Sequence, residues 1–241
     1  MIITRRAFTA ALSLAGLAGI AGLSPLRFIA EAMAQGAADV AKPVSLPDMA
    51  LGPADAKVTI TEYASMTCPH CAAFNADVFP KIKSEFIDTG KIRYIFREFP
   101  LDNLAAAAAM LARCTGGDKT MPFIEVLFEH QKDWAFGEGN PVPKLFEFAK
   151  QAGFTQESFD KCLTDQKLLD DITNGRTRAA EVFGVNATPT FYINGKKLDG
   201  APTMESFDKM IGPILGADAP PASATPAAAP APSGAAPDKS K

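Results

Sequence analysis

The sequence predicts an α/β domain in which a block of helices is inserted between two parts of one sheet. Three patterns predict it: strand, helix and strand over residues 58–96, helical spacing over 103–183, and strand, hairpin and helix over 190–215. The chain has 241 residues, of which 47% are hydrophobic, which is enough for a substantial core. We therefore expect the folded part to cover roughly residues 40–216.

The first part is a strand–helix–strand unit. Alternating residues over 58–63 predict a strand that carries Glu62 on its apolar face. The helix that follows is expected to end at Gly90. Its apolar stripe consists of Phe74, Val78, Ile82 and Phe86. A second strand is expected at 92–96, and a right-handed crossover makes the two strands parallel.

Turn residues separate the remaining elements. Breakers divide the middle of the chain into helices: Gly116-Gly117, residues 137–143 and Gly153. Asn194-Gly195 predicts a type I′ hairpin after a strand at 190–193. Apolar residues at helical spacing predict a last helix over 204–215.

Residues 1–34 are typical of an export signal. Arg5 and Arg6 precede an uncharged apolar run, and Ala34 ends a small-residue motif, so we expect cleavage after Ala34. The arginine pair resembles a twin-arginine signal. A Sec signal with a chance arginine pair and an uncleaved anchor are the alternatives. Either export route predicts localisation in the periplasm, where cysteines are oxidised.

Composition and pattern divide the rest of the chain. Residues 35–54 are interpreted as an N-terminal extension, 55–102 and 184–216 as the α/β domain, and 103–183 as the helical insertion. Residues 217–241 are rich in Ala and Pro, which predicts a disordered or semi-extended tail. A spacer role for this tail is the alternative.

Composition excludes several classes of function. The net charge is −3 and no Lys/Arg cluster is present, so we expect no binding to nucleic acid. Four cysteines are too few for a disulfide-rich scaffold, and two histidines are too few for a His-rich metal site. Because neither a GxGxxG nor a P-loop motif occurs, we expect no nucleotide, flavin or other cofactor. Arg97 and Glu98, adjacent in the chain, are interpreted as partners of each other.

The motif Cys68-Pro69-His70-Cys71 lies where the first strand ends and its helix begins. Pro69 suits the first helical turn, and the helix dipole favours the thiolate of Cys68. Cys71 lies one turn further in, so we expect Cys68 to be the exposed nucleophile and Cys71 the shielded resolving thiol. An inert disulfide and half of a zinc site are the alternatives, but the chain has no second CxxC or CxxH.

With this motif, residues 57–215 resemble the DsbA-like thiol–disulfide oxidoreductases of the thioredoxin superfamily. The resemblance rests on the strand before the cysteines, the CPHC motif, the helical insertion and Thr188-Pro189 before the last hairpin. It implies a thioredoxin fold with an inserted helical domain. CPHC is typical of the oxidase branch, in which the helix N-terminus and His70 are expected to stabilise the Cys68 thiolate and hence the reduced form.

The resemblance also implies a role for Thr188-Pro189. The peptide bond is expected to be cis, with Pro189 against the active-site disulfide and the backbone of Thr188 pairing with an extended substrate segment. An ordinary trans proline at the start of an edge strand is the alternative.

Glu62 lies six residues before Cys68 on the apolar face of its strand. Burial there would raise the pKa of the carboxyl group and let it relay a proton from Cys71, and DsbA-like enzymes have an acid at the matching place. A glutamate near the sheet edge that reaches water is the alternative.

Cys114 and Cys162 both lie in the helical block. A structural disulfide between them would contribute roughly 3–4 kcal/mol in the chain-entropy model. Some alphaproteobacterial DsbA-like proteins look similar, with a non-catalytic pair in the helical domain. Two separate buried thiols are the alternative.

The sequence thus predicts a monomeric periplasmic oxidoreductase that donates the Cys68–Cys71 disulfide to reduced exported proteins. By family resemblance, a DsbB-type, quinone-linked membrane protein would reoxidise it. A disulfide isomerase or reductase of the same superfamily is the first alternative, because a threonine before the cis-proline is also common in isomerases. A peptide-binding or chaperone module is the second.

Overall fold

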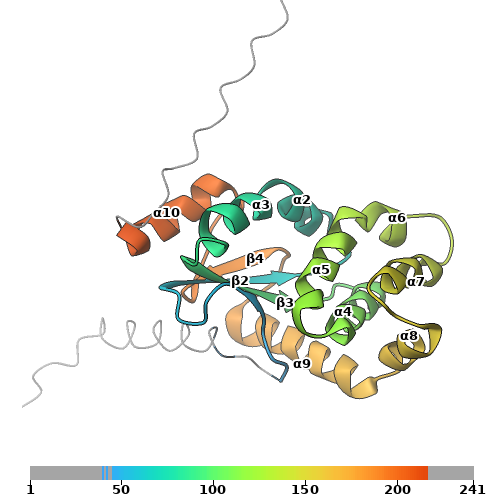
Figure 1. Cartoon of the computed structure of the whole chain (residues 1–241). Helices are drawn as coiled ribbons and strands as arrows, with labels where there is room; N and C mark the ends of the chain where they lie inside the picture. The colour runs from blue at the N-terminus through green and yellow to red at the C-terminus, as the bar shows by residue number, and fades with distance from the viewer. Residues whose placement is uncertain (1–39, 41, 43–44, 217–241) are drawn as a thin grey trace, which may run out of the picture. The chain divides into compact units, whose positions relative to one another are not determined.

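A single mixed sheet organises the computed structural model, which describes residues 40, 42 and 45–216 (Figure 1). Its strands are β1 (Met49–Leu51), β2 (Val58–Ala64), β3 (Ile92–Glu98), β4 (Thr190–Ile193) and β5 (Lys196–Lys197). They lie in the order β1-β3-β2-β4-β5. The central pair β2–β3 is parallel, as expected for a βαβ unit, and the other three pairs are antiparallel.

The apolar stripe predicts one helix that ends at Gly90 between β2 and β3. The structure has three helical segments there instead. They are α2 (Pro69–Asp77), α3 (Phe79–Ile82) and a π-helical turn, η1 (Lys83–Ile87). Pro80 lies in the first turn of α3, where its missing N–H costs no hydrogen bond, so the chain breaks and restarts there. The apolar stripe still faces the core, because Phe74, Ile82 and Phe86 are all buried.

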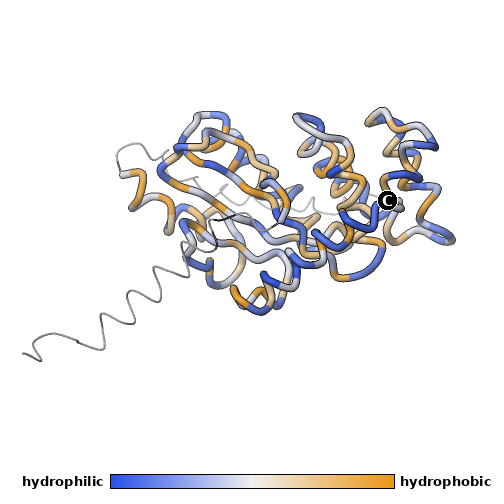
Figure 2. Tube along the Cα trace, turned by 90° about the horizontal axis from the view of Figure 1, so that it is seen from below, coloured by the Kyte–Doolittle hydropathy of each residue, from blue (hydrophilic) through white to orange (hydrophobic). Residues whose placement is uncertain are grey.

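The helical insertion follows β3. Its elements are α4 (Asn103–Thr115), a 3₁₀ turn η2 (Gly117–Lys119), α5 (Thr120–Glu129), α6 (Gln131–Ala135), α7 (Pro141–Gln151), α8 (Gln156–Leu163) and α9 (Gln166–Phe183). Side chains that accept a backbone N–H cap four of these helices: Asp102, Asn140, Thr155 and Asp165. Hydrophobic and hydrophilic residues interchange every few residues along the helical parts of the trace (Figure 2), as expected for helices with one buried face.

The chain returns to the sheet through β4, a hairpin, β5 and α10 (Met204–Leu215). Asn194 and Gly195 both have positive φ, 46° and 79°, as the predicted type I′ turn requires. The Asn194 side chain also accepts from the Thr59 N–H at 2.7 Å and donates to the Lys57 carbonyl at 3.0 Å. The hairpin is thereby joined to the start of β2.

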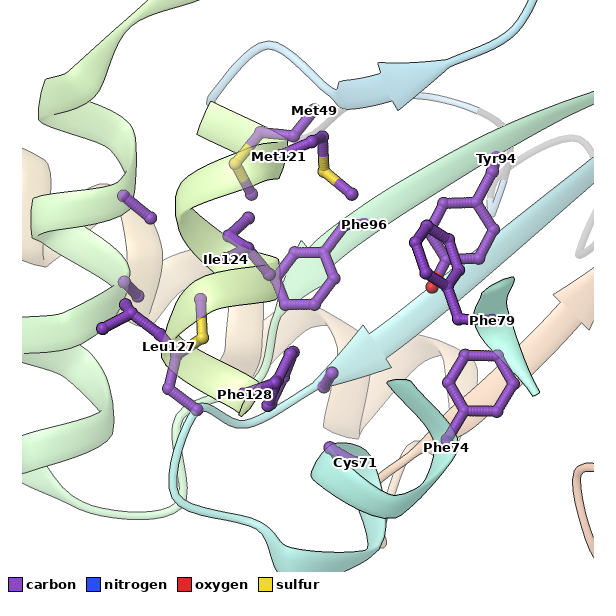
Figure 3. Close-up of a cluster of buried hydrophobic side chains, with 14 of the residues drawn as sticks. Met49, Cys71, Phe74, Phe79, Tyr94, Phe96, Met121, Ile124, Leu127 and Phe128 are labelled. Atoms are coloured by element: carbon purple, nitrogen blue, oxygen red, sulfur yellow. The ribbon is translucent and has the colours of Figure 1, made fainter. Parts of the chain in front are cut away.

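The two faces of the sheet bury separate clusters. Ile60, Tyr94 and Phe191 lie in the larger cluster, which residues of α2, α3, α10 and the insertion complete. Figure 3 shows part of this cluster around Tyr94 and Phe96. Tyr63 and Tyr192 lie in a smaller cluster on the opposite face, which α9 covers (Figure 1). Successive residues of β2 therefore point into different clusters, and Glu62 falls on the side of the larger one.

The N-terminal extension expected over 35–54 is part of the sheet, because it supplies the edge strand β1. Arg97 donates to Asp48 at 2.9 Å and to the Val40 carbonyl at 2.6 Å, and so holds this segment. The predicted pairing of Arg97 with Glu98 is wrong. Adjacent strand residues point to opposite faces, and Glu98 pairs with Arg113 instead.

A disulfide joins Cys114 at the end of α4 to Cys162 in α8, across a separation of 48 residues. The expected pairing is therefore present within the helical insertion. It joins two helices that pack against each other.

Replacing both cysteines, Cys114→Ala with Cys162→Ala, is expected to lower the free energy of unfolding by about 3–4 kcal/mol, because the unfolded chain loses its cross-link. Chemical denaturation of parent and variant measures this difference. Thiol–disulfide exchange at Cys68 and Cys71 should be nearly unchanged. Equal stability of the two proteins would contradict a structural role for the bond.

The described residues contain no helix long and apolar enough to cross a membrane. The export signal expected at 1–34 and the tail expected at 217–241 lie outside the described residues.

Candidate active site

Cys68 is the N-cap residue of α2, with extended backbone angles, and Pro69 occupies the first turn. The Cys68 carbonyl accepts the N–H groups of Cys71 at 3.1 Å and Ala72 at 3.2 Å, which begins the helix. Both cysteines are free thiols, so the structure shows the dithiol form. Cys71 is shielded as predicted, but the prediction that Cys68 is exposed is wrong, because only 5% of its surface is accessible. Pro69 and His70 are exposed beside them.

The surroundings of Cys68 favour its thiolate. A hydrogen bond from the Cys71 thiol, together with the backbone N–H groups of Cys71 and His70, lowers the pKa of Cys68 to about 5, although burial opposes the shift. His70 was expected to stabilise this thiolate. The contribution that the structure shows comes from its backbone N–H, while its side chain is exposed.

Cys71 has the opposite environment. It is fully buried beside Phe74 in the larger cluster (Figure 3). Burial, the hydrogen bond to Cys68 and the nearby charge of Glu62 all raise the pKa of Cys71 far above its usual range. The two thiols therefore have different roles available to them: Cys68 as the attacking or leaving thiolate, and Cys71 as a protonated partner.

Glu62 is buried in the middle of β2, with 2% of its surface exposed, and does not reach water as the alternative interpretation required. Burial raises the pKa of its carboxyl group to about 8, and the hydrogen bond from Tyr94 limits the rise. The hydroxyl group of Tyr94 donates to Oε2. Within the described residues, Oε1 is buried and has no hydrogen-bond partner.

The turn that contains Thr188 and Pro189 brings Thr188 against the active-site thiol. Their peptide bond is cis. The Sγ atom of Cys68 is 3.3 Å from the Thr188 carbonyl oxygen, across 120 residues of sequence. The Thr190 hydroxyl donates to the Ala187 carbonyl at 2.7 Å and anchors this turn at the start of β4. The backbone of Thr188 is thus beside the sulfur that a substrate would attack.

Sequence reasoning missed two residues of this site, Gln131 and Tyr94. Gln131, in α6, is buried, and its Nε2 donates to the carbonyls of Met66 at 2.8 Å and Cys68 at 3.0 Å. The insertion thus holds the loop before α2. No local sequence pattern predicts this contact, because its partners lie more than 60 residues apart. Tyr94 falls within the strand predicted at 92–96. The structure pairs it with Ile60, on the face of β2 that carries Glu62.

A groove of about 670 Å³ runs beside the cysteine motif, between α2 and the helices α5 and α6. Pro69, Ala73 and Ala76 form one wall, and Glu129 and Lys132 lie on the other. Small side chains on α2 leave room there for a polypeptide segment. Within residues 40, 42 and 45–216, no three His, Cys, Asp or Glu side chains are grouped as a metal site requires.

The fold matches known proteins. Residues 45–212, more than half of the chain, match the family model described as thioredoxin. The crystal structure of Wolbachia pipientis alpha-DsbA1 is similar with a TM-score of 0.69 and 33% sequence identity, over 75% of this chain and 96% of that one. The predicted thioredoxin fold with an inserted helical domain is therefore confirmed.

Two proteins of similar sequence have names that refer to disulfide chemistry. The "Putative protein-disulfide oxidoreductase" of Rickettsia bellii is 37% identical over 153 residues, which are 61% of this chain and 57% of that protein. "Disulfide bond formation protein D" of Bacillus subtilis is 31% identical over 150 residues, 61% of this chain and 67% of that protein. The chain thus matches little more than half the length of the Rickettsia relative.

Proposed function

The chain belongs to the DsbA-like proteins of the thioredoxin superfamily, and on that premise we propose that it is a thiol–disulfide oxidase. It donates a disulfide between Cys68 and Cys71 to reduced polypeptides. The observation that carries the proposal is the contrast between the two thiols. A Cys68 pKa of about 5 makes its thiolate stable at neutral pH, whereas Cys71 is held protonated. A stabilised reduced form makes the disulfide form oxidising.

The reaction has two exchange steps. A client thiolate attacks Sγ of Cys68, the Cys68–Cys71 bond breaks, and Cys71 leaves with the electron pair and takes up a proton. A second client thiolate then attacks the client sulfur of the mixed disulfide, and Cys68 leaves as a thiolate. The client has lost two electrons and gained a disulfide, and the protein is left as the dithiol. The backbone of Thr188 lies where an extended client segment would pair.

Clients and partners follow from the same proposal. The clients are reduced exported proteins, and a DsbB-type, quinone-linked membrane protein reoxidises the dithiol. The protein acts as a monomer in the periplasm. The signal-like sequence at 1–34 supports this location, and so does the Cys114–Cys162 bond, because structural disulfides persist in oxidising compartments.

A disulfide isomerase of the same superfamily is the second candidate, and Thr188 before the cis-proline favours it. The experiment that separates the functions uses three clients of one sequence: reduced, disulfide-scrambled and cysteine-free. We expect the oxidised protein to remove thiols from the reduced client. Recovery of the scrambled client alone would establish an isomerase, and help for the cysteine-free client alone would establish a chaperone.

A further inference from the structure

The hydroxyl group of Tyr94 stands out among the aromatic residues of the larger cluster. The ring of Phe79 lies 4.9 Å from its own, in a cluster whose other aromatic residues are mostly phenylalanines (Figure 3). Tyr94 is 2% exposed, so its hydroxyl is cut off from water and must find a partner inside the protein. That partner is Oε2 of Glu62. A phenylalanine would fill the same space without this requirement.

The other two tyrosines of the chain, Tyr63 and Tyr192, lie in the smaller cluster on the opposite face. The Tyr63 hydroxyl accepts from Arg97 at 2.9 Å, and the Tyr192 hydroxyl donates to the Phe183 carbonyl at 2.6 Å. Both contacts belong to the framework. Tyr94 alone among the three contacts a residue next to the active-site thiols.

We propose that Tyr94 is a positioning residue for proton transfer at Cys71: its hydroxyl holds one oxygen of Glu62 and leaves the other to exchange a proton with the Cys71 thiol. This inference deepens the proposed function and rests on it. The buried, unpartnered Oε1 is the oxygen left for that exchange. The hydrogen bond from Tyr94 fixes the orientation of the carboxyl group, and Glu62 lies close enough to Cys71 for its charge to act on that thiol.

Over one reaction cycle, Glu62 gives one proton to Cys71 and receives one back. When a client thiolate attacks Cys68, Cys71 leaves as a thiolate and the protonated carboxyl of Glu62 gives it the proton. Glu62, now a carboxylate, keeps the hydrogen bond from Tyr94. When the reoxidising partner's disulfide has reacted with Cys68, Cys71 returns its proton to Glu62 and its thiolate attacks Sγ of Cys68, which releases the partner as a thiolate.

The charged groups around this pair keep Tyr94 a donor throughout. Those facing it are Glu62 on β2, Cys68 and Cys71 at the start of α2, and Glu125 on α5. Burial and the charge of Glu62 raise the pKa of Tyr94 well above its usual value, so the hydroxyl keeps its proton. Its hydrogen bond lowers the pKa of Glu62, because a donor stabilises the carboxylate.

The test compares Tyr94→Phe with Tyr192→Phe, which removes a hydrogen-bonded tyrosine hydroxyl on the far face of the sheet. A small dithiol cleaves the Cys68–Cys71 disulfide in each protein over a range of pH. Carbon-13 labelling of the glutamate carboxyl groups reports the midpoint of the Glu62 titration. The Glu62 signal is identified as the one missing from the spectrum of Glu62→Gln. We expect Tyr94→Phe to be about tenfold slower and to raise the Glu62 midpoint by about one pH unit. Tyr192→Phe should change neither.

Equal rates and midpoints in Tyr94→Phe and the parent would overturn the inference, and so would equal losses in the two variants. If Tyr94→Phe does not fold, the ring carbon-13 signal of Tyr94 in the parent decides. Its chemical shift should change with pH at the midpoint of the Glu62 titration, and this change should be lost in Glu62→Gln. A Tyr94 chemical shift that does not follow the Glu62 titration overturns the inference. Neither measurement needs a client protein, so failure of the proposed function is seen separately.

Discussion

Cys68→Ser is expected to lose disulfide transfer by more than about a thousandfold, because the mixed disulfide with the client forms only at this sulfur. Serine has nearly the same size and keeps the N-cap position, so the fold should remain. Cys68 has only 5% of its surface exposed, but it is the sulfur at the helix start beside Thr188. Loss of thiols from a reduced client, counted over time, measures the effect.

Cys71→Ser is the matched variant. With Cys68 intact and no resolving thiol, it should accumulate a covalent complex with the client that a reductant reverses. Mass spectrometry identifies that complex and its cysteine. Transfer at the parent rate by Cys68→Ser, or a complex through another cysteine, would contradict the assignment of Cys68 as the nucleophile.

Glu62→Gln is expected to slow cleavage of the Cys68–Cys71 disulfide by about a hundredfold at pH 7, because the leaving Cys71 thiolate loses its proton donor. The amide keeps an oxygen for Tyr94, so packing is conserved. Stopped-flow reaction with a small dithiol, corrected for the thiolate content of that reagent, measures the rate. In the parent this corrected rate should fall as pH rises through about 8, where Glu62 loses its proton.

The same carboxyl group couples stability to pH. Its pKa in the folded protein, about 8, lies above the ordinary value of 4.5, so its contribution to stability is present below pH 4.5 and is lost as pH rises to about 8. Relative to Glu62→Gln, the parent should therefore lose stability across this interval. If the rate and the stability fell with rising pH equally in the parent and in Glu62→Gln, that result would contradict a buried acid at position 62.

The sequence predicted best those features that depend on residues close together in the chain. The CPHC motif at a strand–helix junction predicted where Cys68 and Cys71 lie, and strand parity placed Glu62 beneath them. Asn194-Gly195 predicted its turn because both residues accept positive φ.

The features that could not be predicted depend on contacts distant in sequence. Strand β1 has three residues and is held by Arg97, which lies 49 residues beyond Asp48. Gln131 reaches the active-site loop from the insertion, 63 residues after Cys68. The cause of the low Cys68 pKa was also predicted only in part. The hydrogen bond from the Cys71 thiol lowers this pKa most, and His70 contributes through its backbone N–H.

The reduction potential of the Cys68–Cys71 pair tests the oxidase most directly. Equilibration of the full protein with glutathione buffers, with the dithiol and disulfide forms separated by alkylation, measures it. We expect a value above about −180 mV, because the Cys68 thiolate stabilises the reduced form. A value near that of thioredoxin, about −270 mV, would contradict the oxidase and assign the protein to the reductive branch.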